Sequence, residues 1–347
     1  MSRTSDIVND LRQIQTGYGL MSLTWRPEPI PKDIAFVSMK RVIDIALERN
    51  TKAFFNVGEF YGLDKINLIL VKEFFEKYPN LRQHVIISCK GGVDDKTLSP
   101  KGKYASVIES IETSLKYIGG YIDIFEVARL DTSILKEGEV YPYESFKALA
   151  DKIEEGRIGA ISLSEVNELQ IRSIHNDWKK YLACVEVELS LFSTNILYDG
   201  VAKACSDLGL VIICYSPLGR GLLTGHITPS STFKPGDFRA VLKRFQTDSL
   251  IKNQVCIDFL NNIVKERPED QKCSLVQLAL GWVKYWNSRE EFKGAKFIPI
   301  PSGSTVDKVN ENFNEEKGKI TEKEFEKINE FLKTFQVAGD RYEMAIN

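Results

Sequence analysis

The residue best suited to chemistry is Tyr61, which stands near the end of the stretch FFNVGEFYG at residues 54–62. The first half of this stretch is apolar, which is typical of a buried strand, and the second half is a polar loop that contains glycine. A tyrosine at the exit of a parallel strand could donate a proton to a substrate. It could also be a core ring with a bonded hydroxyl, since the chain has 13 tyrosines. The interpretation therefore depends on its neighbours.

A lysine, Lys90, closes the next apolar run, HVIISCK at residues 84–90. An ammonium group partly withdrawn from water favours the phenolate form of a neighbouring tyrosine and lowers the pKa of that phenol from about 10. We therefore expect Lys90 to lower the pKa of Tyr61, so that the phenol can donate a proton near neutral pH. The alternative is that Lys90 is a solvated charge at the end of its strand.

Two further segments carry residues suited to binding phosphate. YSPLGRG at residues 215–221 combines a serine and glycines, which let the backbone approach closely, with the charge of Arg220. PSGSTVDKVNEN at residues 301–312 leads into a helix N-terminus, with Lys308 one turn in, and such a terminus binds phosphate. Each segment alone could be an ordinary capped turn, but together they indicate a dinucleotide. The Rossmann fingerprint is missing, because GYGLMS at residues 17–22 matches only half of GxGxxG.

Short apolar runs alternate with helical patterns along most of the chain, which is the pattern of parallel βα units. We count eight units, and eight in one chain favour a closed (β/α)8 TIM barrel, an α/β fold, over two doubly wound sheets. Without an internal repeat or a low-complexity linker, we expect a single domain over residues 1–347. The expected strands are residues 19–25, 52–57, 84–90, 121–129, 158–164, 184–191, 208–216 and 295–300.

Other expectations concern the connections. Asp64 is placed to cap the helix after the second strand. A long loop at residues 217–249, rich in glycine and proline, follows the seventh strand, and loops of this length are usually functional. A C-terminal helix at residues 321–335 precedes a tail at residues 337–347 without periodicity. In such a barrel the reactive groups belong at the C-terminal ends of the strands.

The composition of the 347-residue chain narrows the class of partner. The formal net charge is −2 and charges of both signs are interspersed, which argues against a nucleic acid. No segment has the pattern of a signal peptide or about 18 uninterrupted apolar residues, so we expect a cytoplasmic protein without a membrane partner. Six cysteines without paired metal spacing and only three histidines predict reduced thiols and no metal site. We expect a monomer that acts on a small molecule.

The chain resembles the aldo-keto reductase family from about residue 17 to residue 342. The matching segments are, in order, FFNVGEFYG, VIISCK, YIDIFEVAR, IGAISLSEV, YSPLGRGLLTG, IPIPSGS with the following KVNEN, and VAGDRY. The tyrosine loop, YSPLGRG and IPIP in this order on eight βα units form a specific combination. Within the family, SLTWR at residues 22–26 and the VAR ending of the fourth strand resemble the fungal pyridoxal reductases.

The resemblance implies NADPH-dependent reduction of a carbonyl, with a hydride from C4 of the nicotinamide and a proton from Tyr61. The family's catalytic tetrad is Asp, Tyr, Lys and His, and the matching positions here are Asn56, Tyr61, Lys90 and Ala128. Two of the four differ. Asn56 cannot neutralise Lys90, so we expect Lys90 to act more strongly on Tyr61, or to lose its own proton if it is buried. Ala128 leaves space at the mouth of the barrel.

The resemblance also implies a cofactor site. Family members place the tyrosine at the end of the seventh strand under the nicotinamide ring and polar side chains at its carboxamide. The pyrophosphate runs along the loop after the seventh strand, and the 2′-phosphate and adenine lie at the helix after the eighth. The matching residues, with Arg220 and Ser302 added for their charge and position, are Tyr215, Ser164, Glu186, Ser216, Leu218, Gly219, Arg220, Ser302, Lys308, Glu311 and Asn312. The pair Ser164 and Glu165 replaces a common Ser-Asn, and Glu186 replaces a common glutamine.

For the substrate, we expect contacts with Trp25, Ala128 and Arg129. By strand alternation Glu126 points the same way as Ala128, one layer deeper, and Glu186 and Glu188 share an inward parity. Our hypothesis is that the volume left by Ala128 accepts an aromatic aldehyde such as pyridoxal, which is reduced to pyridoxine. Arg129 or an inward glutamate would contact its polar substituents.

Three functions therefore stay open. The first is an NADPH-dependent reductase of pyridoxal, and the second is an aldo-keto reductase for another carbonyl substrate. The third is a regulatory or sensor protein that binds NADP(H) with little turnover. Retention of both Tyr61 and Lys90 favours an enzyme, because a protein that only binds the cofactor has no need of an acid with an adjusted pKa.

Overall fold

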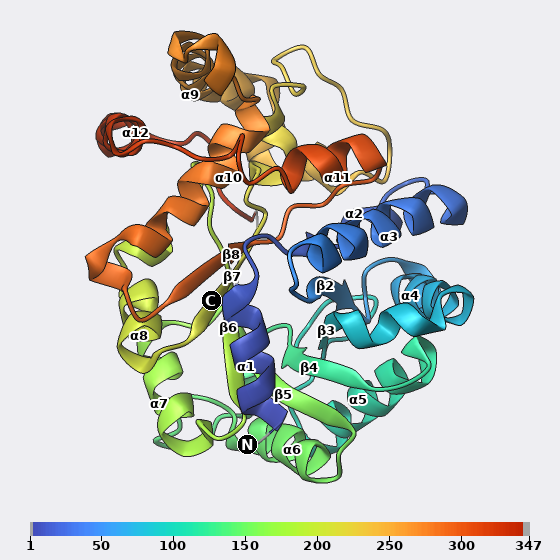
Figure 1. Ribbon diagram of the computed structural model, residues 1–347. Coiled ribbons are helices and arrows are strands. Elements are labelled where there is room, and N and C mark those ends of the chain that lie inside the picture. Colours follow the sequence, from blue (N-terminus) through green and yellow to red (C-terminus); the bar gives the residue numbers. More distant parts are fainter. Residues whose placement is uncertain (1–2, 343–347) are drawn as a thin grey trace.

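Eight parallel strands form one sheet in sequential order in the computed structural model, which describes residues 3–342 (Figure 1). The strands are β1 Tyr18–Gly19, β2 Ala53–Gly58, β3 Val85–Gly91, β4 Ile122–Val127, β5 Ile158–Ser164, β6 Leu182–Glu188, β7 Val211–Tyr215 and β8 Lys296–Pro299. The N–H of Gly17 donates to the carbonyl of Pro299 at 2.9 Å, and that of Gly19 to Pro301 at 3.2 Å. These bonds join the last strand to the first, so the sheet curves into the (β/α)8 barrel that the sequence predicts.

The barrel interior is apolar toward the N-terminal ends of the strands, which we call the lower end, and polar toward their C-terminal ends, which we call the mouth. Because side chains alternate along a strand, Phe54 and Asn56 of β2 share the inner face, as do Ile124 and Glu126 of β4. Phe54 and Ile124 belong to a buried apolar cluster that includes side chains from seven of the strands, β2 to β8. Asn56 and Glu126, one layer higher, are just as deeply buried. The apolar core therefore ends where the candidate site begins.

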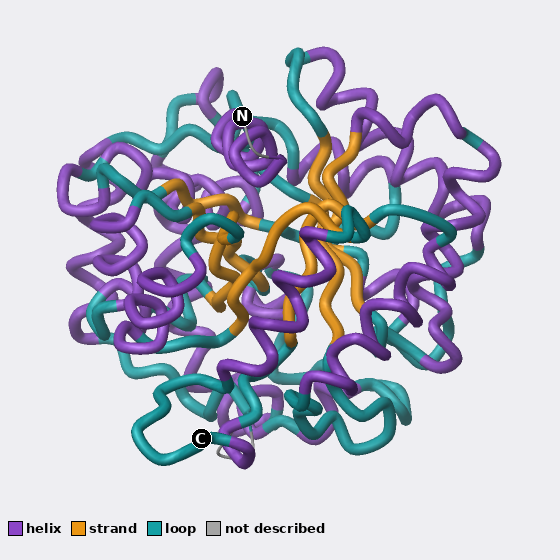
Figure 2. Tube along the Cα trace, turned by 90° about the horizontal axis from the view of Figure 1, so that it is seen from below, coloured by secondary structure: helices purple, strands orange, loops and turns teal. Residues whose placement is uncertain are grey.

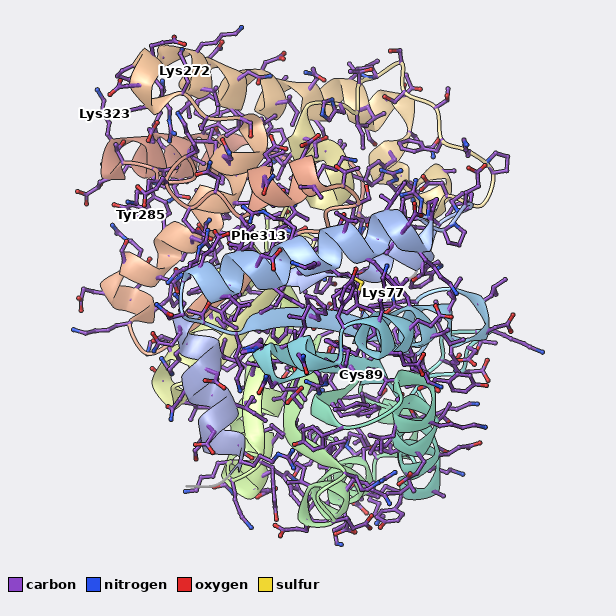
Figure 3. All side chains as sticks on the ribbon, turned by 45° about the vertical axis from the view of Figure 1, so that its right-hand side comes forward. Lys77, Cys89, Lys272, Tyr285, Phe313 and Lys323 are labelled. Atoms are coloured by element: carbon purple, nitrogen blue, oxygen red, sulfur yellow. The ribbon has the colours of Figure 1, made fainter. Side chains whose placement is uncertain are left out.

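Helices cover the outside of the sheet, as a parallel sheet buried on both faces requires. They are α3 Lys32–Glu48, α4 Ile66–Lys77, α5 Tyr104–Ile118, α6 Tyr143–Glu154, α7 Glu168–Trp178, α8 Val201–Leu208 and α10 Leu275–Tyr285. Three further helices pack on these helices and on one another: α9 Thr247–Glu266, α11 Val306–Asn312 and α12 Glu322–Thr334. Figure 3 shows Lys272 and Lys323 at the rim of the molecule and Cys89 within it. All six cysteines are free and buried, which confirms the prediction of reduced thiols.

A helix that the sequence pattern did not predict, α1 Arg3–Gln13, closes the lower end of the barrel. Its side chains Ile7 and Leu11 join the inner apolar cluster. Arg12 Nη2 donates to the carbonyl of Gly209 at 2.7 Å. Figure 2 shows the N-terminal helix and the C-terminal segment on opposite sides of the strands. The lower end is therefore closed by α1, and the other end carries the loops.

The first strand is shorter than expected. β1 contains only Tyr18–Gly19, whereas residues 19–25 were predicted, and a short helix, α2 Met21–Thr24, follows it. The N–H of Leu20 donates to the carbonyl of Asn56, and the N–H of Leu23 donates to the carbonyl of Leu20. The chain therefore turns into a helical conformation as soon as its pairing with β2 ends, and the prediction of an extended segment up to residue 25 is wrong.

Two other expectations, for the start of β7 and the start of α4, are wrong. Leu208 belongs to α8, so β7 begins at Val211. Asp64 has a positive φ of 53° and its side chain makes no cap; α4 begins two residues later, at Ile66. A residue in the left-handed region cannot provide the extended backbone that an N-cap needs. The other six predicted strands overlap those in the structure.

The segments near the C-terminus return to the mouth of the barrel. After β7 the chain forms the 3-10 turns Gly219–Thr224, Phe238–Val241 and Lys243–Phe245 before α9. The expected C-terminal helix is present as α12, where the Thr321 side chain accepts a hydrogen bond from the N–H of Glu324. The tail then packs against the 3-10 turns, since Arg244 Nε donates to the carbonyl of Gly339 at 3.1 Å. The remainder of the predicted tail, residues 343–347, lies outside the described residues.

Between residues 3 and 342, no helix combines the length and the apolar character that a membrane crossing needs.

The packing of α1 can be tested with Leu11→Ala. Leu11 is fully buried, so the cavity left by the substitution should lower the free energy of unfolding by about 2–4 kcal/mol. Urea unfolding followed by circular dichroism measures the change. Leu169→Ala is the control, because Leu169 is 60% exposed on α7 and its loss should cost less than about 0.5 kcal/mol. Equal effects of the two substitutions would contradict the role of α1 in the core.

Candidate active site

Tyr61 lies buried in the loop after β2, at the C-terminal end of the strands. Its carbonyl accepts a hydrogen bond from Thr24 Oγ1 at 2.6 Å. Its ring stacks on Trp25, with centroids 6.0 Å apart and planes at 28°. Gly58 makes room for the ring, because a Cβ at that position would lie 2.7 Å from Tyr61 Cγ. Three neighbours thus fix the phenol, and Trp25, predicted to contact the substrate, is one of them.

Lys90 lies at the centre of the mouth with two carboxylates. Its Nζ is 2.7 Å from Glu186 Oε1 and 3.4 Å from Glu126 Oε1. Glu186 Oε2 accepts a second hydrogen bond from Asn56 Nδ2 at 2.6 Å. None of these four residues is more than 6% exposed. The expectation that Lys90 acts without a neutralising carboxylate is therefore wrong, because β4 and β6 supply carboxylates that position 56 does not.

Burial raises the pKa of the Tyr61 phenol above its ordinary value, because desolvation disfavours the phenolate. Lys90 acts in the opposite direction, while Glu186 and Glu126 add to the rise. The expectation that Lys90 lowers the pKa of Tyr61 below its ordinary value is therefore wrong, since the effect of desolvation exceeds the attraction of the ammonium. The phenol keeps its proton across the neutral range, which is the state that a proton donor needs.

The charges of Lys90 and Glu126 also depend on burial and on the neighbouring charges. Burial works against the ammonium form of Lys90, but Glu126, Glu186 and Tyr61 raise its pKa well above the ordinary value. Loss of the lysine proton, the other expectation for a buried Lys90, is therefore excluded. Burial and the neighbouring Glu186 raise the pKa of the Glu126 carboxyl well above its ordinary value. The cluster thus combines a stabilised ammonium group with a carboxyl group whose protonated form is favoured by its surroundings.

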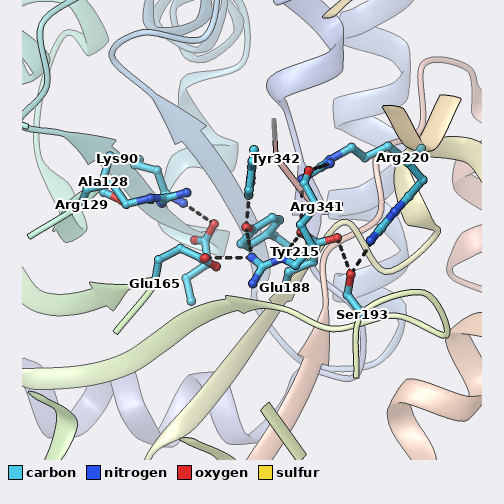
Figure 4. Close-up of polar contacts among 12 residues, drawn as sticks. Lys90, Ala128, Arg129, Glu165, Glu188, Ser193, Tyr215, Arg220, Arg341 and Tyr342 are labelled. Atoms are coloured by element: carbon cyan, nitrogen blue, oxygen red, sulfur yellow. Dashed lines mark hydrogen bonds and ion pairs between the residues drawn. The ribbon is translucent and has the colours of Figure 1, made fainter. Parts of the chain in front are cut away.

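Tyr215, the last residue of β7, lies beside this cluster, with Lys90 Nζ 5.5 Å from its ring centroid. Its hydroxyl is 2.9 Å from Arg341 Nη2 and 2.8 Å from the hydroxyl of Tyr342 (Figure 4). Arg341 also lies 2.8 Å from Glu165 Oε2. The tail residues Arg341 and Tyr342 are therefore part of the mouth, although no role was predicted for them. The only signal in the sequence was the family-like segment VAGDRY.

Glu188 connects the tail with the loop after β7. Its Oε2 is 3.0 Å from Arg341 Nε and 3.2 Å from Arg220 Nη2, and its Oε1 accepts a hydrogen bond from Ser193 Oγ at 3.0 Å. The guanidinium of Arg220 also lies 4.6 Å from the ring centroid of Tyr342. The inward parity predicted for Glu188 is confirmed, but Glu188 contacts arginines of the rim. The contact of Arg220 with a pyrophosphate stays a prediction.

The predicted substrate residues Ala128 and Arg129 follow the end of β4. The N–H of the buried Ala128 donates to the carbonyl of Gly91 at 2.8 Å. Arg129 Nη1 donates to the carbonyl of Ala128 at 2.7 Å, and the guanidinium lies 5.9 Å from the ring centroid of Tyr342. Figure 4 shows Ala128 and Arg129 on the same side of the mouth as Lys90. The structure thus brings both residues to the side of the mouth where Lys90 lies.

The two segments predicted to bind phosphate follow neighbouring strands, because β7 pairs with β8. After β7, Ser216 and Gly219 have positive φ values of 48° and 57°. The N–H of Gly219 donates to the carbonyl of Ser216 at 2.9 Å, which forms a tight turn, and Leu218 packs on the outer core. This turn directly follows Tyr215 and includes the buried Gly219, and its contact with a pyrophosphate stays a prediction.

After β8, Ser302 and Asn312 are linked, since Asn312 Nδ2 donates to the carbonyl of Ser302 at 3.2 Å. The Thr305 side chain caps α11 by accepting a hydrogen bond from the N–H of Lys308 at 3.3 Å. The exposed Lys308 places its Nζ 3.4 Å from Ser304 Oγ. Glu311 lies on the same helix. These residues form a polar group at the β8 side of the mouth, separate from the cluster around Lys90.

A model of the Aldo/keto reductase family matches residues 15–333. The chain belongs to the aldo/keto reductase family. It is 61% identical, over 98% of its length and 99% of the relative's, to a Saccharomyces cerevisiae protein named as a pyridoxal reductase. It is 32% identical to a Schizosaccharomyces pombe protein named as pyridoxal reductase 2, over 97% of this chain and 96% of the other. The resemblance drawn from the sequence is confirmed.

The fold of this aldo/keto reductase also matches that of a solved glycerol dehydrogenase from Gluconobacter oxydans. The TM-score is 0.71 with 20% sequence identity, and the match covers 95% of each chain. Membership of the family makes the chain an oxidoreductase. In this aldo/keto reductase, the four positions that correspond to the family's tetrad, Asn56, Tyr61, Lys90 and Ala128, lie together at the mouth, as the sequence predicts.

The raised pKa of Glu126 makes the stability of the protein depend on pH. The folded protein holds this proton to a higher pH than the unfolded chain, which releases it above a pH of about 4.3, so the free energy of unfolding should fall as pH rises above that value, by up to about 1.4 kcal/mol per pH unit from this group. Glu126→Gln cannot release a proton. As pH rises from 5 to 8, the free energy of unfolding of the wild type, measured in urea, should therefore fall relative to that of Glu126→Gln. Parallel pH profiles of the two proteins would contradict a protonated Glu126.

Proposed function

We propose that this aldo/keto reductase reduces an aldehyde with NADPH, and that the aldehyde is pyridoxal, which becomes pyridoxine. The observation that carries the reaction class is a buried phenol that keeps its proton beside a buried ammonium, Tyr61 and Lys90, at the mouth of the barrel. The choice of pyridoxal is supported by the 61% identity with the Saccharomyces cerevisiae protein named as a pyridoxal reductase.

Tyr61 supplies the proton in the proposed reaction. Bound NADPH would supply the hydride that the carbonyl carbon accepts. The Tyr61 hydroxyl donates a hydrogen bond to the carbonyl oxygen and transfers its proton as negative charge develops there. The ammonium of Lys90 then attracts the phenolate that remains, and burial of both groups strengthens this attraction.

The nicotinamide end of the mouth fits an amide ligand. Among the described residues, the buried Ser164 Oγ and Glu165 Oε1 have no hydrogen-bond partner. Ser164 is the last residue of β5, and Glu165 has a positive φ of 53°. Because buried polar groups are normally paired, a carboxamide, which both donates and accepts, suits this pair. Ser164 and Glu165, with Glu186 as a further acceptor, would hold it against Tyr215.

The remainder of the cofactor would follow the rim of the mouth. The turn formed by Ser216, Leu218 and Gly219 would receive the pyrophosphate, with Arg220 and Ser302 nearby. The polar group after β8 would receive the adenosine, with Lys308 at the 2′-phosphate and Glu311 and Asn312 at the adenine. A phosphate adds about 2 negative charges, so the exposed ammonium of Lys308 is the group that would distinguish NADPH from NADH.

The substrate ring would lie between Trp25 and the space beside Ala128. An aromatic ring gains by stacking on tryptophan, and Trp25 already stacks on the ring of Tyr61. Arg129 would contact the polar substituents of pyridoxal, since its guanidinium lies at the same side of the mouth as Lys90.

Replacement of the proposed acid gives the first test. Tyr61→Phe should lower kcat for pyridoxal by about 10²–10⁴-fold because the proton donor is lost. The affinity for NADPH should be retained. NADPH oxidation followed by ultraviolet absorbance, with pyridoxal and a panel of simple aldehydes, measures turnover. Tyr198→Phe, at a residue that is 74% exposed, is the control.

The same assay separates the alternatives. Full activity of Tyr61→Phe would refute its role as the acid. Wild-type turnover of other aldehydes without turnover of pyridoxal would refute the proposed substrate. Binding of NADPH without turnover of any aldehyde would instead support the regulatory or sensor protein.

A second test concerns the choice of cofactor. Lys308→Ala should raise the KM for NADPH by about two- to fivefold, the size expected for one exposed charge pair, and should leave the KM for NADH unchanged. Steady-state kinetics with both cofactors measures this. Lys323→Ala, at an exposed lysine of α12, is the control for a change in net charge. Equal effects of Lys308→Ala on the two cofactors would contradict the contact with the 2′-phosphate.

A further inference from the structure

The carboxylate closest to Lys90 comes from a distant strand of the barrel. Glu186, on β6, places Oε1 2.7 Å from Lys90 Nζ on β3 and Oε2 2.6 Å from Asn56 Nδ2 on β2. The strand order puts β2 and β3 side by side, with two further strands between β3 and β6. Each oxygen of Glu186 is therefore bonded to a donor from another strand, and the carboxylate is fixed in both position and orientation.

Glu126 stands in a different relation to Lys90. The two residues are direct neighbours in the register of β3 and β4, yet Glu126 Oε1 lies 3.4 Å from Lys90 Nζ, which is longer than a usual N–H···O hydrogen bond. One ammonium cannot neutralise two buried carboxylates that lie close together. Glu186, which receives two short donor contacts, is therefore the charged partner, and Glu126 is the carboxyl that keeps its proton.

A buried ammonium needs such a partner. When one member of a buried ion pair is removed, the other remains as an uncompensated charge, which is strongly unfavourable. Without Glu186, Lys90 would move its Nζ away from the mouth, favour its neutral form, or pair with Glu126, whose carboxyl would then release its proton. In each case the ammonium would no longer be held in the position from which it stabilises the phenolate that Tyr61 leaves after proton transfer.

We propose that Glu186 is a positioning residue for the reduction, because its carboxylate holds the ammonium of Lys90 at Tyr61 and supplies the negative charge that Asn56 cannot. This inference rests on the proposed function, since it concerns the acid of that reaction. It gives Glu186 a role in proton transfer besides its predicted contact with the nicotinamide carboxamide.

The hydrogen bond between residues 56 and 186 offers a matched test. Glu186→Gln removes the carboxylate. The double substitution Asn56→Asp with Glu186→Gln restores one carboxylate and one amide, with donor and acceptor exchanged, so that the charge of the cluster equals that of the wild type. If Glu186 acted through packing alone, the change of charge in Glu186→Gln would have little effect, because glutamine has nearly the shape of glutamate.

In Glu186→Gln, kcat for pyridoxal should fall by about tenfold to a thousandfold, the range for loss of one fixed electrostatic partner. The Kd for NADPH, measured from quenching of protein fluorescence, should change much less than kcat. In the double variant, kcat should recover by at least about tenfold relative to Glu186→Gln, as expected for two residues in one network.

The pH profile gives a second readout. Loss of the negative neighbour lowers the pKa of Lys90, so the basic limb of the kcat profile should move to lower pH in Glu186→Gln and back toward the wild-type position in the double variant. The other groups that face Lys90 Nζ, namely Glu126 from β4, Tyr61 from the loop after β2 and Tyr215 from β7, are the same in all three proteins.

Unchanged kcat and an unchanged pH profile in Glu186→Gln would overturn the proposal, and so would a double variant no faster than the single one. If circular dichroism shows that Glu186→Gln alone does not fold, the double variant decides. Turnover by the double variant supports the proposal, and a folded double variant that binds NADPH without turnover overturns it. Failure of the proposed function is distinguishable, because it would already appear as a lack of turnover in the wild type.

Discussion

The buried ammonium of Lys90 determines which side chains the mouth of the barrel can accept. An unpaired charge in the interior would cost several kcal/mol, so the strands that face Lys90 must carry polar or acidic groups where they would otherwise carry apolar ones. The inner layer therefore changes from Phe54 and Ile124 to Asn56 and Glu126 within one alternation of the strands. In the proposed reaction the same ammonium would attract the Tyr61 phenolate, so stability and the proposed chemistry depend on the same group.

A second charged network surrounds Tyr215. Glu165 and Glu188 supply two carboxylates, and Arg220 and Arg341 supply two guanidinium groups. These residues come from the ends of β5 and β6, from the loop after β7 and from the C-terminal tail. The rim of the mouth is thus assembled from segments far apart in the sequence, and each depends on the others to neutralise its charge.

The barrel could be predicted from the sequence because its signals are local. Alternating apolar runs and helical patterns located most strands, and strand alternation correctly placed Glu126, Glu186 and Glu188 on the inner face. The ends of β1 could not be predicted in this way, since they depend on where pairing with β2 stops. The helix α1 has few apolar residues, and only its place under the barrel explains why Ile7 and Leu11 are buried.

The interactions within the site were harder to predict than the residues that belong to it. Asn56, Tyr61, Lys90 and Ala128 follow from matching segments, but the partner of Lys90 lies 96 residues away on β6. Nothing in the neighbourhood of Lys90 in the sequence indicates that Glu186 is the partner. The direction of the pKa shift at Tyr61 was wrong for a related reason. The sequence shows that a lysine follows on the next strand, but it does not show how completely the phenol is removed from water.

The positions of α1 and of the tail have a practical consequence for handling the protein. The helix α1 lies at the lower end of the barrel, whereas Tyr342 contacts the hydroxyl of Tyr215 at the opposite end. A purification tag or a surface anchor joined upstream of α1 would leave the mouth clear. The same addition after Tyr342 would load a segment that is in contact with Tyr215 at the mouth, so attachment chemistry is best directed to the N-terminal side.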